Sequence, residues 1–343
     1  MKIQISKNDN AVIVRGETNV PSYKDTIEGG QRMFKYSIRR ILLTIPTIFI
    51  TISVIFFVLR ILPSDPAGVI LGDNATPEAL EALRENLGLN DPIGVQYWEF
   101  IKNTVQADFG NSLTSGRPVS EQILSLIPYT FELALASLFI AVIIGVPIGI
   151  YSSIKRDSIP DAFFRLFALI GISMPAFFLG ILLMLVFSLK LPLFPSMGAG
   201  EGFIDSLSHL ALPALTLGLI EAGIVMRITR SSMMEEVNMD YVRTAKAKGV
   251  PKKKVILKHI LRNSLIPVIT VIGLNMTTLI SGAVLTETVF SRPGLGSLAV
   301  GAIETRDYPT LQACLVLFCG LVVFVNLIVD LSYSLLNPRI RQN

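Results

Sequence analysis

Six long apolar segments follow one another after residue 40, and they constrain the fold more than any other feature. Their cores cover residues 41–59, 133–154, 166–189, 210–226, 264–286 and 308–329. A helix needs roughly 20 apolar residues to cross about 30 Å of hydrocarbon. The sequence therefore predicts an all-α integral membrane protein with six transmembrane helices, at about residues 38–60, 130–152, 163–189, 209–227, 264–288 and 308–334.

Composition excludes a soluble protein of ordinary type, because 51% of the residues are hydrophobic, 16% are charged and the mean hydropathy is +0.59. Glu221 interrupts the fourth segment. Its carboxylate costs about 2.5 to 3.5 kcal/mol to insert, which roughly half a dozen Leu, Ile or Val residues offset, so this segment can still span. Pro147, Pro175 and Pro213 are expected to bend their helices.

The loops alternate in charge and so predict the topology. Residues 227–262 contain ten basic and three acidic residues, whereas residues 61–127 contain three basic and nine acidic ones. Short basic clusters flank the first, second and sixth segments on the same side as residues 227–262: Lys35, Arg39, Arg40, Lys155, Arg156, Arg339 and Arg341. By the positive-inside rule both termini are cytoplasmic. The net charge of +4 therefore reports orientation rather than binding of nucleic acid.

The chain divides into a flexible cytoplasmic extension, residues 1–32, and a membrane domain, residues 33–343. Met33 is a possible translation start. The long first outer loop is expected to be partly helical: Thr76 can cap a helix that Gly88 ends, and Pro118 can open another. There is no metal-ligand spacing and no GxxxxGK[S/T] phosphate loop, so the chain is expected to bind no cofactor and to be no enzyme.

The basic loop, residues 228–263, has the pattern of a short helix presented between two spans. Asn238 or Asp240 can cap a helix that runs to Lys248, and Gly249 can end it in a left-handed turn. Pro251 can then open the next helix. This pattern predicts a rigid docking element. The alternative is that the lysines only set the orientation and contact anionic lipid headgroups.

Residues 240–249, DYVRTAKAKG, and 259–269, HILRNSLIPVI, resemble the EAA-type loop of permease subunits in the dipeptide/oligopeptide/nickel family of ABC importers. The resemblance covers about residues 33–341 and is closest to the B-type subunit. It includes GISMPAFFLG at 171–180, HLALPALTLG at 209–218 and ETVFSRPGLG at 287–296. One departure is that Arg243-Thr244-Ala245 stands where the general motif has Glu-Ala-Ala, which looks usual for the peptide branch.

The resemblance implies a half-channel in a bacterial or archaeal cytoplasmic membrane that imports di- or oligopeptides. Its expected partners are a second homologous permease, two cytoplasmic ATPase subunits that carry ATP and Mg²⁺, an extracytoplasmic substrate-binding protein and membrane lipid. The residues expected to couple to an ATPase are Asp240, Tyr241, Arg243, Thr244, Ala245, Lys246 and Gly249.

Glu221, Asn275 and Thr278 are candidates for the translocation pathway, since intramembrane carboxylates usually face a bundle interior or a wet cavity. Glu221 could meet the amine of a passing peptide or pair with a basic residue of the partner permease. Glu132, Glu287 and Asp330 lie near helix ends and are expected to be structural. Other cargoes within the family are a nickel chelate, glutathione or an oligosaccharide. Outside this family, one alternative function is a non-transporting membrane sensor or assembly protein, and another is a secondary transporter.

Overall fold

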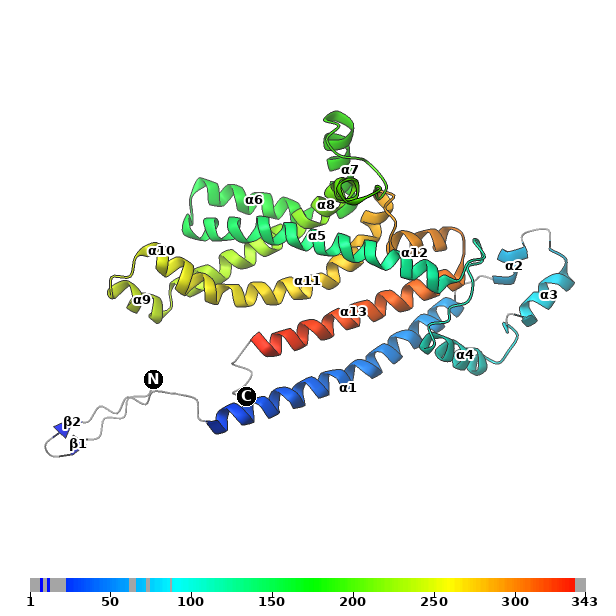
Figure 1. Cartoon of the computed structure of the whole chain (residues 1–343), viewed down its shortest axis with the longest axis horizontal. Coiled ribbons are helices and arrows are strands. Elements are labelled where there is room, and N and C mark those ends of the chain that lie inside the picture. The colour runs from blue at the N-terminus through cyan, green and yellow to red at the C-terminus, as the bar shows by residue number, and fades with distance from the viewer. Residues whose placement is uncertain are drawn as a thin grey trace.

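A computed structural model of the chain describes residues 7–8, 11–12, 23–61, 66–71, 75–86 and 88–336. These residues form an elongated, helical molecule (Figure 1). Its helices are α1 Tyr23–Ile61, α2 Pro66–Leu71, α3 Pro77–Asn86, α4 Ile93–Val105, α5 Val119–Ile154, α6 Ile159–Ser173, α7 Ala176–Leu183, η1 Met184–Lys190, α8 Phe203–Val237, α9 Asp240–Ala247, α10 Lys252–Lys254, η2 Val255–Ile260, α11 Leu261–Val289, α12 Leu295–Glu304 and α13 Tyr308–Leu336.

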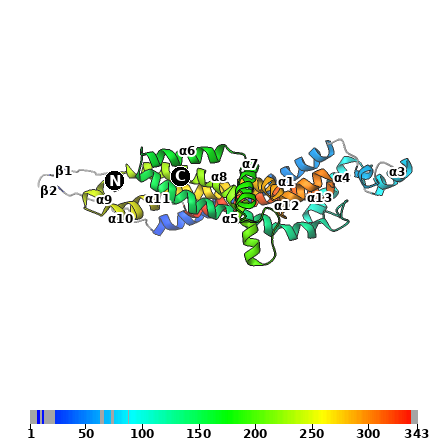
Figure 2. The same cartoon turned by 90° about the horizontal axis from the view of Figure 1, so that it is seen from above.

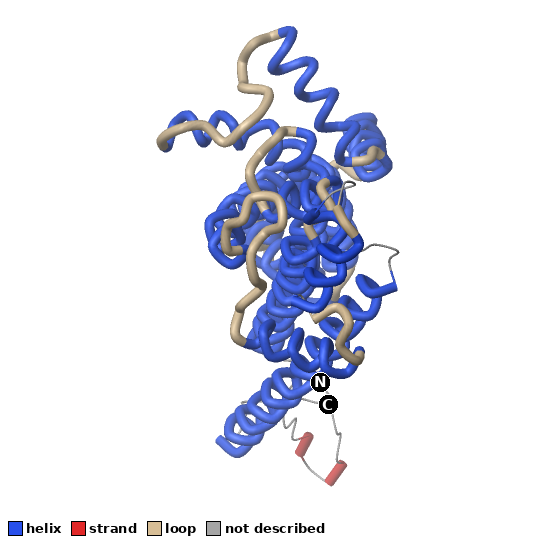
Figure 3. Tube along the Cα trace, turned by 90° about the vertical axis from the view of Figure 1, so that its right-hand side faces the viewer, coloured by secondary structure: helices blue, strands red, loops and turns tan. Residues whose placement is uncertain are grey.

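Strand is confined, in the part described, to the antiparallel pair β1 Lys7–Asn8 and β2 Ala11–Val12 (Figure 3). Helix α1 begins at Tyr23, within the predicted extension; most of the rest of that extension lies outside the described residues, as do Leu87, Arg339 and Arg341.

Five described helices are long and apolar enough to cross a membrane: Ser37–Arg60, Val119–Ile154, Phe203–Val237, Lys252–Val289 and Tyr308–Leu331. The predicted span at 163–189 is different. It is a broken pair, Ile159–Ser173 and Ala176–Lys190, bent by 109°, and in Figure 2 α7 runs across the direction of α6. Counting this pair as one span gives six.

The break follows from Pro175, which lies just before α7. Proline lacks an N–H for the helix ladder and disfavours helical geometry in the residue before it. Met174 accordingly takes an extended conformation, with φ −81° and ψ 132°, and α6 ends at Ser173. The predicted bend at Pro175 is present, and it divides the predicted span at 163–189 into two helices. Pro147 and Pro213 lie inside α5 and α8.

The described part of the predicted first outer loop is partly helical, as predicted. The Thr76 hydroxyl accepts a hydrogen bond from the Ala79 amide at 3.3 Å and so caps α3. Gly88 has a φ of +66° just beyond that helix, a left-handed conformation that glycine adopts without strain. Pro118 is the residue before α5, which begins at Val119 and not near residue 130.

The centre of the bundle is the pair α5 and α8, packed closely through glycines. A Cβ added at Gly149 would lie 2.6 Å from the Cβ of Thr229, and one at Gly145 would lie 2.7 Å from the carbonyl oxygen of Ala222. Lipid is as apolar as leucine, so helices in a membrane associate through van der Waals packing and hydrogen bonds, and small residues permit the contact. These glycines therefore hold the two helices together.

Helices α1 and α13 form a second pair beside this core (Figure 1). Arg40 and Asp330 form an ion pair at 2.9 Å. Near the opposite ends of these helices, Phe56 of α1 packs in an apolar cluster with Phe100 of α4 and Val316 of α13. The expectation that Asp330 is structural is consistent with this contact.

A buried polar cluster fixes α12 at the end of the bundle away from α9. Glu287, fully buried, accepts hydrogen bonds from the Thr130 hydroxyl at 2.6 Å and from the Gly296 amide at 2.7 Å. Arg292, also buried, donates to Glu132 at 2.6 Å. Gly294 is required here, because a Cβ would lie 2.2 Å from the carboxylate carbon of Glu287. Glu132 and Glu287 thus make structural contacts.

Candidate functional site

The basic loop contains α9, an eight-residue helix presented at one end of the bundle (Figure 1). Met239 precedes its first residue with φ −70° and ψ 146°, and no side chain caps the helix. The prediction that Asn238 or Asp240 caps it is therefore wrong. Asn238 belongs instead to the end of α8, where its amide donates to the Met234 carbonyl oxygen at 3.0 Å.

The other end of α9 has the predicted geometry. Gly249 has a φ of +74°, and its amide donates to the Lys246 carbonyl oxygen at 3.0 Å. The Val250 amide donates to the Ala245 carbonyl oxygen at 3.2 Å, so the orphan carbonyls of the last turn are satisfied. Pro251, with φ −55°, is the residue before α10, from which the chain continues through the π-helical turn η2 into α11.

Two small apolar side chains attach α9 to the bundle. Val242 is fully buried and Ala245 is 9% exposed. Both pack in a cluster with Met233 of α8 and with Val255 and Ile260 of η2. Ala245, one of the predicted coupling residues, therefore faces inward and positions the helix.

Tyr241 provides a polar attachment beside this cluster. Its hydroxyl hydrogen-bonds the Glu236 carboxylate, lies 3.3 Å from the His259 carbonyl oxygen and accepts from the Asn263 amide at 3.0 Å. Partial burial, together with the hydrogen bond to Glu236, raises the pKa of Tyr241 above its ordinary value. The hydroxyl therefore keeps its proton near neutral pH and can donate.

The outward face of α9 is polar and exposed. It carries Asp240, Arg243, Thr244 and Lys246, with Gly249 just beyond. The side chains of Asp240 and Arg243 are 97% and 74% exposed and lie 3.7 Å apart, at a distance where a surface pair contributes little to stability. Charges that are not used for stability remain available to another protein.

The structure brings together two of the three pathway candidates. Glu221 is 4% exposed, and its carboxylate accepts a hydrogen bond from the Asn275 amide of α11 at 2.6 Å. Thr278 lies three residues further along α11 and is exposed. Thr277 instead donates to the Asn326 side chain of α13 at 3.1 Å, which joins two helices.

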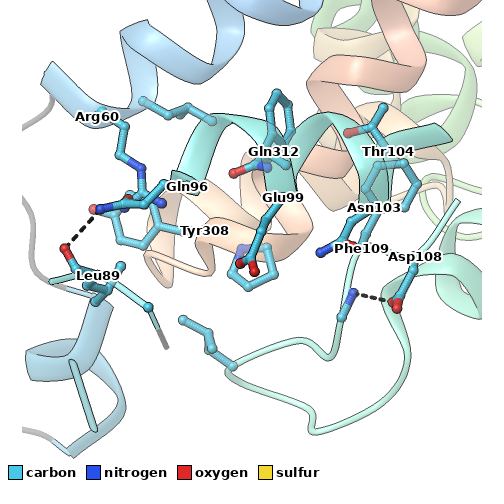
Figure 4. Close-up of a pocket in the computed structure, with 16 residues that line it drawn as sticks. Arg60, Leu89, Gln96, Glu99, Asn103, Thr104, Asp108, Phe109, Tyr308 and Gln312 are labelled. Atoms are coloured by element: carbon cyan, nitrogen blue, oxygen red, sulfur yellow. Dashed lines mark hydrogen bonds between the residues drawn. The ribbon is translucent and has the colours of Figure 1, made fainter. Parts of the chain in front are cut away.

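A pocket of about 450 Å³ with a mixed polar and apolar lining lies where the predicted first outer loop meets α1 and α13. Figure 4 shows Gln96, Glu99 and Thr104 of α4 lining it with Arg60 and Tyr308. The Gln96 amide donates to the Leu89 carbonyl oxygen at 3.0 Å. None of the predicted site residues lies there.

Two buried acidic residues were missed by the sequence analysis. Asp161, fully buried, holds Arg230 through two hydrogen bonds of 2.9 Å. Asp307 accepts hydrogen bonds from the Ser112 and Thr310 hydroxyls at 2.6 and 2.9 Å. Burial raises the pKa of Asp307, but these hydrogen bonds outweigh it and hold that pKa below its ordinary value. Asp161 follows the capping residue Ser158, a signal that could have marked it as structural.

Within the described ranges, no group of three or more His, Cys, Asp or Glu side chains could hold a metal ion. Cys314 and Cys319 are free thiols in α13, the first of them buried. The exposed polar face of α9 is therefore the candidate contact surface.

The family models and the similar proteins are all membrane components of transport systems. A family model described as "Binding-protein-dependent transport system inner membrane component" matches residues 145–342, and a model of the N-terminal part of such components matches residues 33–134. The glutathione transport system permease protein GsiC of Escherichia coli (strain K12) is 44% identical over 309 residues, 90% of this chain and 99% of that protein.

GsiC of Salmonella typhimurium (strain LT2) is 43% identical over the same shares of the two chains. A solved structure of the MetNI methionine ABC transporter, in inward-facing conformations, aligns with a TM-score of 0.50 and 18% identity. That alignment covers 62% of this chain and 95% of the other, and at such an identity it shows the fold alone.

Proposed function

This chain belongs to the family of binding-protein-dependent transport system inner membrane components and is a permease subunit of an ABC importer, and we propose that its cargo is a short peptide, with glutathione the first candidate. One observation carries the proposal: the identity of 44% extends over 99% of the length of a glutathione permease. Glutathione is itself a tripeptide with a free amine, so the proposal stays within the peptide class that the sequence predicted.

Uptake by cells tests the cargo. The chain would be expressed with the genes of its system in a strain that lacks its own peptide and glutathione importers. We expect uptake of labelled glutathione that an excess of unlabelled glutathione abolishes and that a nickel chelate or an oligosaccharide leaves unchanged. Competition by dipeptides alone would point to a di- or oligopeptide importer, and competition by neither would reject the peptide class.

We also propose that α9 docks on a cytoplasmic ATPase subunit and transmits its movement to the membrane helices. The proposed assembly contains a second permease, two ATPases that hold ATP and Mg²⁺, and an extracytoplasmic binding protein, with both termini of this chain in the cytoplasm. Support comes from the geometry: α9 is short, attached at Val242 and Tyr241, and polar on its free face. Asp240, Arg243, Thr244 and Lys246 are the proposed contacts, and Ala245 and Gly249 hold the angle.

Substitution of Gly249 tests the coupling. A Cβ at this position meets nothing within 4 Å, so only its φ of +74° opposes a side chain. Valine in the left-handed region costs about 1 to 2 kcal/mol, whereas asparagine is tolerated there. We expect Gly249→Val to abolish most transport and ATPase stimulation by the binding protein in a complex that still assembles, and Gly249→Asn to retain both. Equal activity of the two variants would exclude the angle of α9 as the coupling element.

Glu221 and Asn275 are proposed to line the translocation pathway, where the carboxylate would meet the amine of the peptide. Glu221→Gln keeps an oxygen that can accept the Asn275 hydrogen bond and removes only the charge. We expect the KM for uptake to rise severalfold while assembly is normal, and Glu235→Gln on the same helix to change neither. An unchanged KM in Glu221→Gln would leave this carboxylate a structural partner of Asn275.

A further inference from the structure

A groove of about 630 Å³ runs between α6 and α8 at the end of the bundle that carries α9. Its floor is apolar and is made by Ala168, Leu169 and Ile172 of α6 with Met226 and Met234 of α8. Leu169 is 59% exposed, and the exposed apolar side chains Phe163, Leu166, Phe167 and Ile170 continue along the outside of α6. The floor therefore opens onto a largely apolar surface of α6.

Three arginines line the same groove: Arg165, Arg227 and Arg230. Arg230 is committed to Asp161 by its two hydrogen bonds of 2.9 Å. The Arg165 guanidinium lies 3.6 Å from the same carboxylate and is half exposed. One buried carboxylate thus serves two guanidinium groups.

Arg227 is exposed, and no carboxylate of the described chain forms an ion pair with it. Glu235 is the only acidic residue among those that line the groove, and the buried Asp161 pairs with two of the lining arginines from outside it. Three guanidinium groups therefore face two carboxylates, so the groove keeps one positive charge beside its apolar floor. This charge matches a ligand with one negative charge and a long apolar part.

We propose that this groove binds an anionic phospholipid, whose phosphate lies on Arg165 and Arg227 and whose acyl chain lies on the floor. Arginine binds phosphate through two parallel N–H donors, and basic pockets between membrane helices take acidic headgroups. Ser231, Glu235 and Asn238 lie at the polar end of the groove, where hydroxyls of a glycerol headgroup can hydrogen-bond. The proposal goes beyond the transport of peptides and does not depend on the cargo.

The position of the groove predicts that a bound lipid affects α9. Asn238 lines it and is followed by Met239 and then by α9. A bound lipid would therefore join α6 to the last turn of α8, the turn from which α9 projects. A zwitterionic phospholipid or a second permease subunit are the competing occupants of the groove.

Native mass spectrometry of the full-length chain, purified with the subunits that accompany it, tests the proposal. Phosphatidylglycerol or phosphatidylcholine with identical acyl chains is titrated, and the dissociation constant of each bound lipid is measured. We expect one tight phosphatidylglycerol, and the double variant Arg165→Gln, Arg227→Gln to weaken it roughly thirtyfold, since each basic residue near a headgroup contributes about fivefold. The control Lys252→Gln, Lys253→Gln removes the same charge from the exposed start of α10 and should retain it.

The variant Leu169→Trp distinguishes loss of the lipid site from a folding defect of the arginine variant, because it keeps all three arginines and fills the apolar floor of the groove. It should also displace the lipid while the complex stays intact. The proposal is overturned if phosphatidylcholine binds as tightly as phosphatidylglycerol, or if the arginine variant and the lysine control lose equal affinity. It is also overturned if the thiol of the variant Leu169→Cys is shielded from maleimide by a second permease with no lipid bound. None of these readouts involves uptake, so failure here leaves the proposed transport untouched.

Discussion

Helices α9 and α12 are both short helices, lie toward opposite ends of the bundle of long helices and are held in different ways (Figure 1). The amides at the start of α12 are satisfied by buried side chains: Leu295 bonds to the Thr130 hydroxyl at 2.9 Å, and Gly296 bonds to Glu287 at 2.7 Å. The start of α9 has no side-chain cap, and its first residue, Asp240, is almost fully exposed.

The difference predicts that α9 is the more mobile of the two helices. The buried Glu287 carboxylate accepts hydrogen bonds from Thr130 and from the amides at the start of α12, so a movement of α12 would break buried hydrogen bonds. Helix α9 is attached only through Val242, Ala245 and Tyr241, and it leaves its polar face free. An element held at one face can be pushed by another protein, whereas an element held at both its end and its face serves as the fixed part.

The largest effect is expected for Glu287→Ala, which breaks the fixed helix. Removal of the carboxylate leaves the buried amides of Gly296 and Ser297 and the Thr130 hydroxyl without their acceptor. Each orphaned group costs about 1 to 3 kcal/mol, so the loss of stability is roughly 3 to 5 kcal/mol. Thermal unfolding in detergent measures it, with Glu304→Ala at the exposed end of α12 as the control. Equal midpoints for the two variants would mean that α12 does not depend on Glu287.

Gly294→Ala should have the next largest effect. The added methyl group would lie 2.2 Å from the Glu287 carboxylate carbon, so the buried cluster must shift. Overpacking of this kind costs about 1 to 3 kcal/mol. Gly301→Ala in α12 meets nothing within 4 Å and is the matched control, which should be neutral or slightly stabilising. The same unfolding measurement compares the pair, and a neutral Gly294→Ala would contradict the tight fit.

The smallest effect is expected for Tyr241→Phe, which tests how much the polar attachment of α9 contributes. The variant loses the contacts with Glu236 and Asn263, worth about 1 kcal/mol, but keeps the apolar attachment. Overall stability should hardly change, while amide hydrogen exchange within α9 becomes faster. Thr244→Ala, which removes an exposed hydroxyl bonded only to the Asp240 carbonyl oxygen at 3.0 Å, should leave exchange unchanged. Unchanged exchange in Tyr241→Phe would show that Val242 and Ala245 suffice.

Local sequence was a good guide wherever one segment determines its own structure. Apolar runs predicted the long helices, and Thr76, Pro118 and Gly249 each mark an end because their backbone chemistry acts within a few residues. The angle at Pro175 could not be read in the same way. Proline interrupts the helix, but the packing of the two pieces sets the 109° bend.

Partners far apart in the chain escaped prediction. Asp161 and Arg230 are 69 residues apart, and Thr130 and Glu287 are 157 residues apart. No local pattern relates such residues, because only the packing of α6 against α8, and of α5 against α11, brings them together. Ala245 was predicted to be a coupling residue because it lies in the EAA-type motif. Its contact with Met233 and Val255 in the structure shows that its side chain faces inward.

The wide turn η2, Val255–Ile260, connects α10 with α11 without a break. A π-helical turn winds its residues around a larger circle than an α-helix does, and such turns are frequent at functional sites. The segment that follows α10 is therefore shorter along its axis than the same six residues would be in an α-helix. If this turn tightened to α-helical geometry, the segment would lengthen along its axis and α11 would rotate. The proposed movement of α9 would then reach α11 as a combined rotation and translation, without a hinge loop.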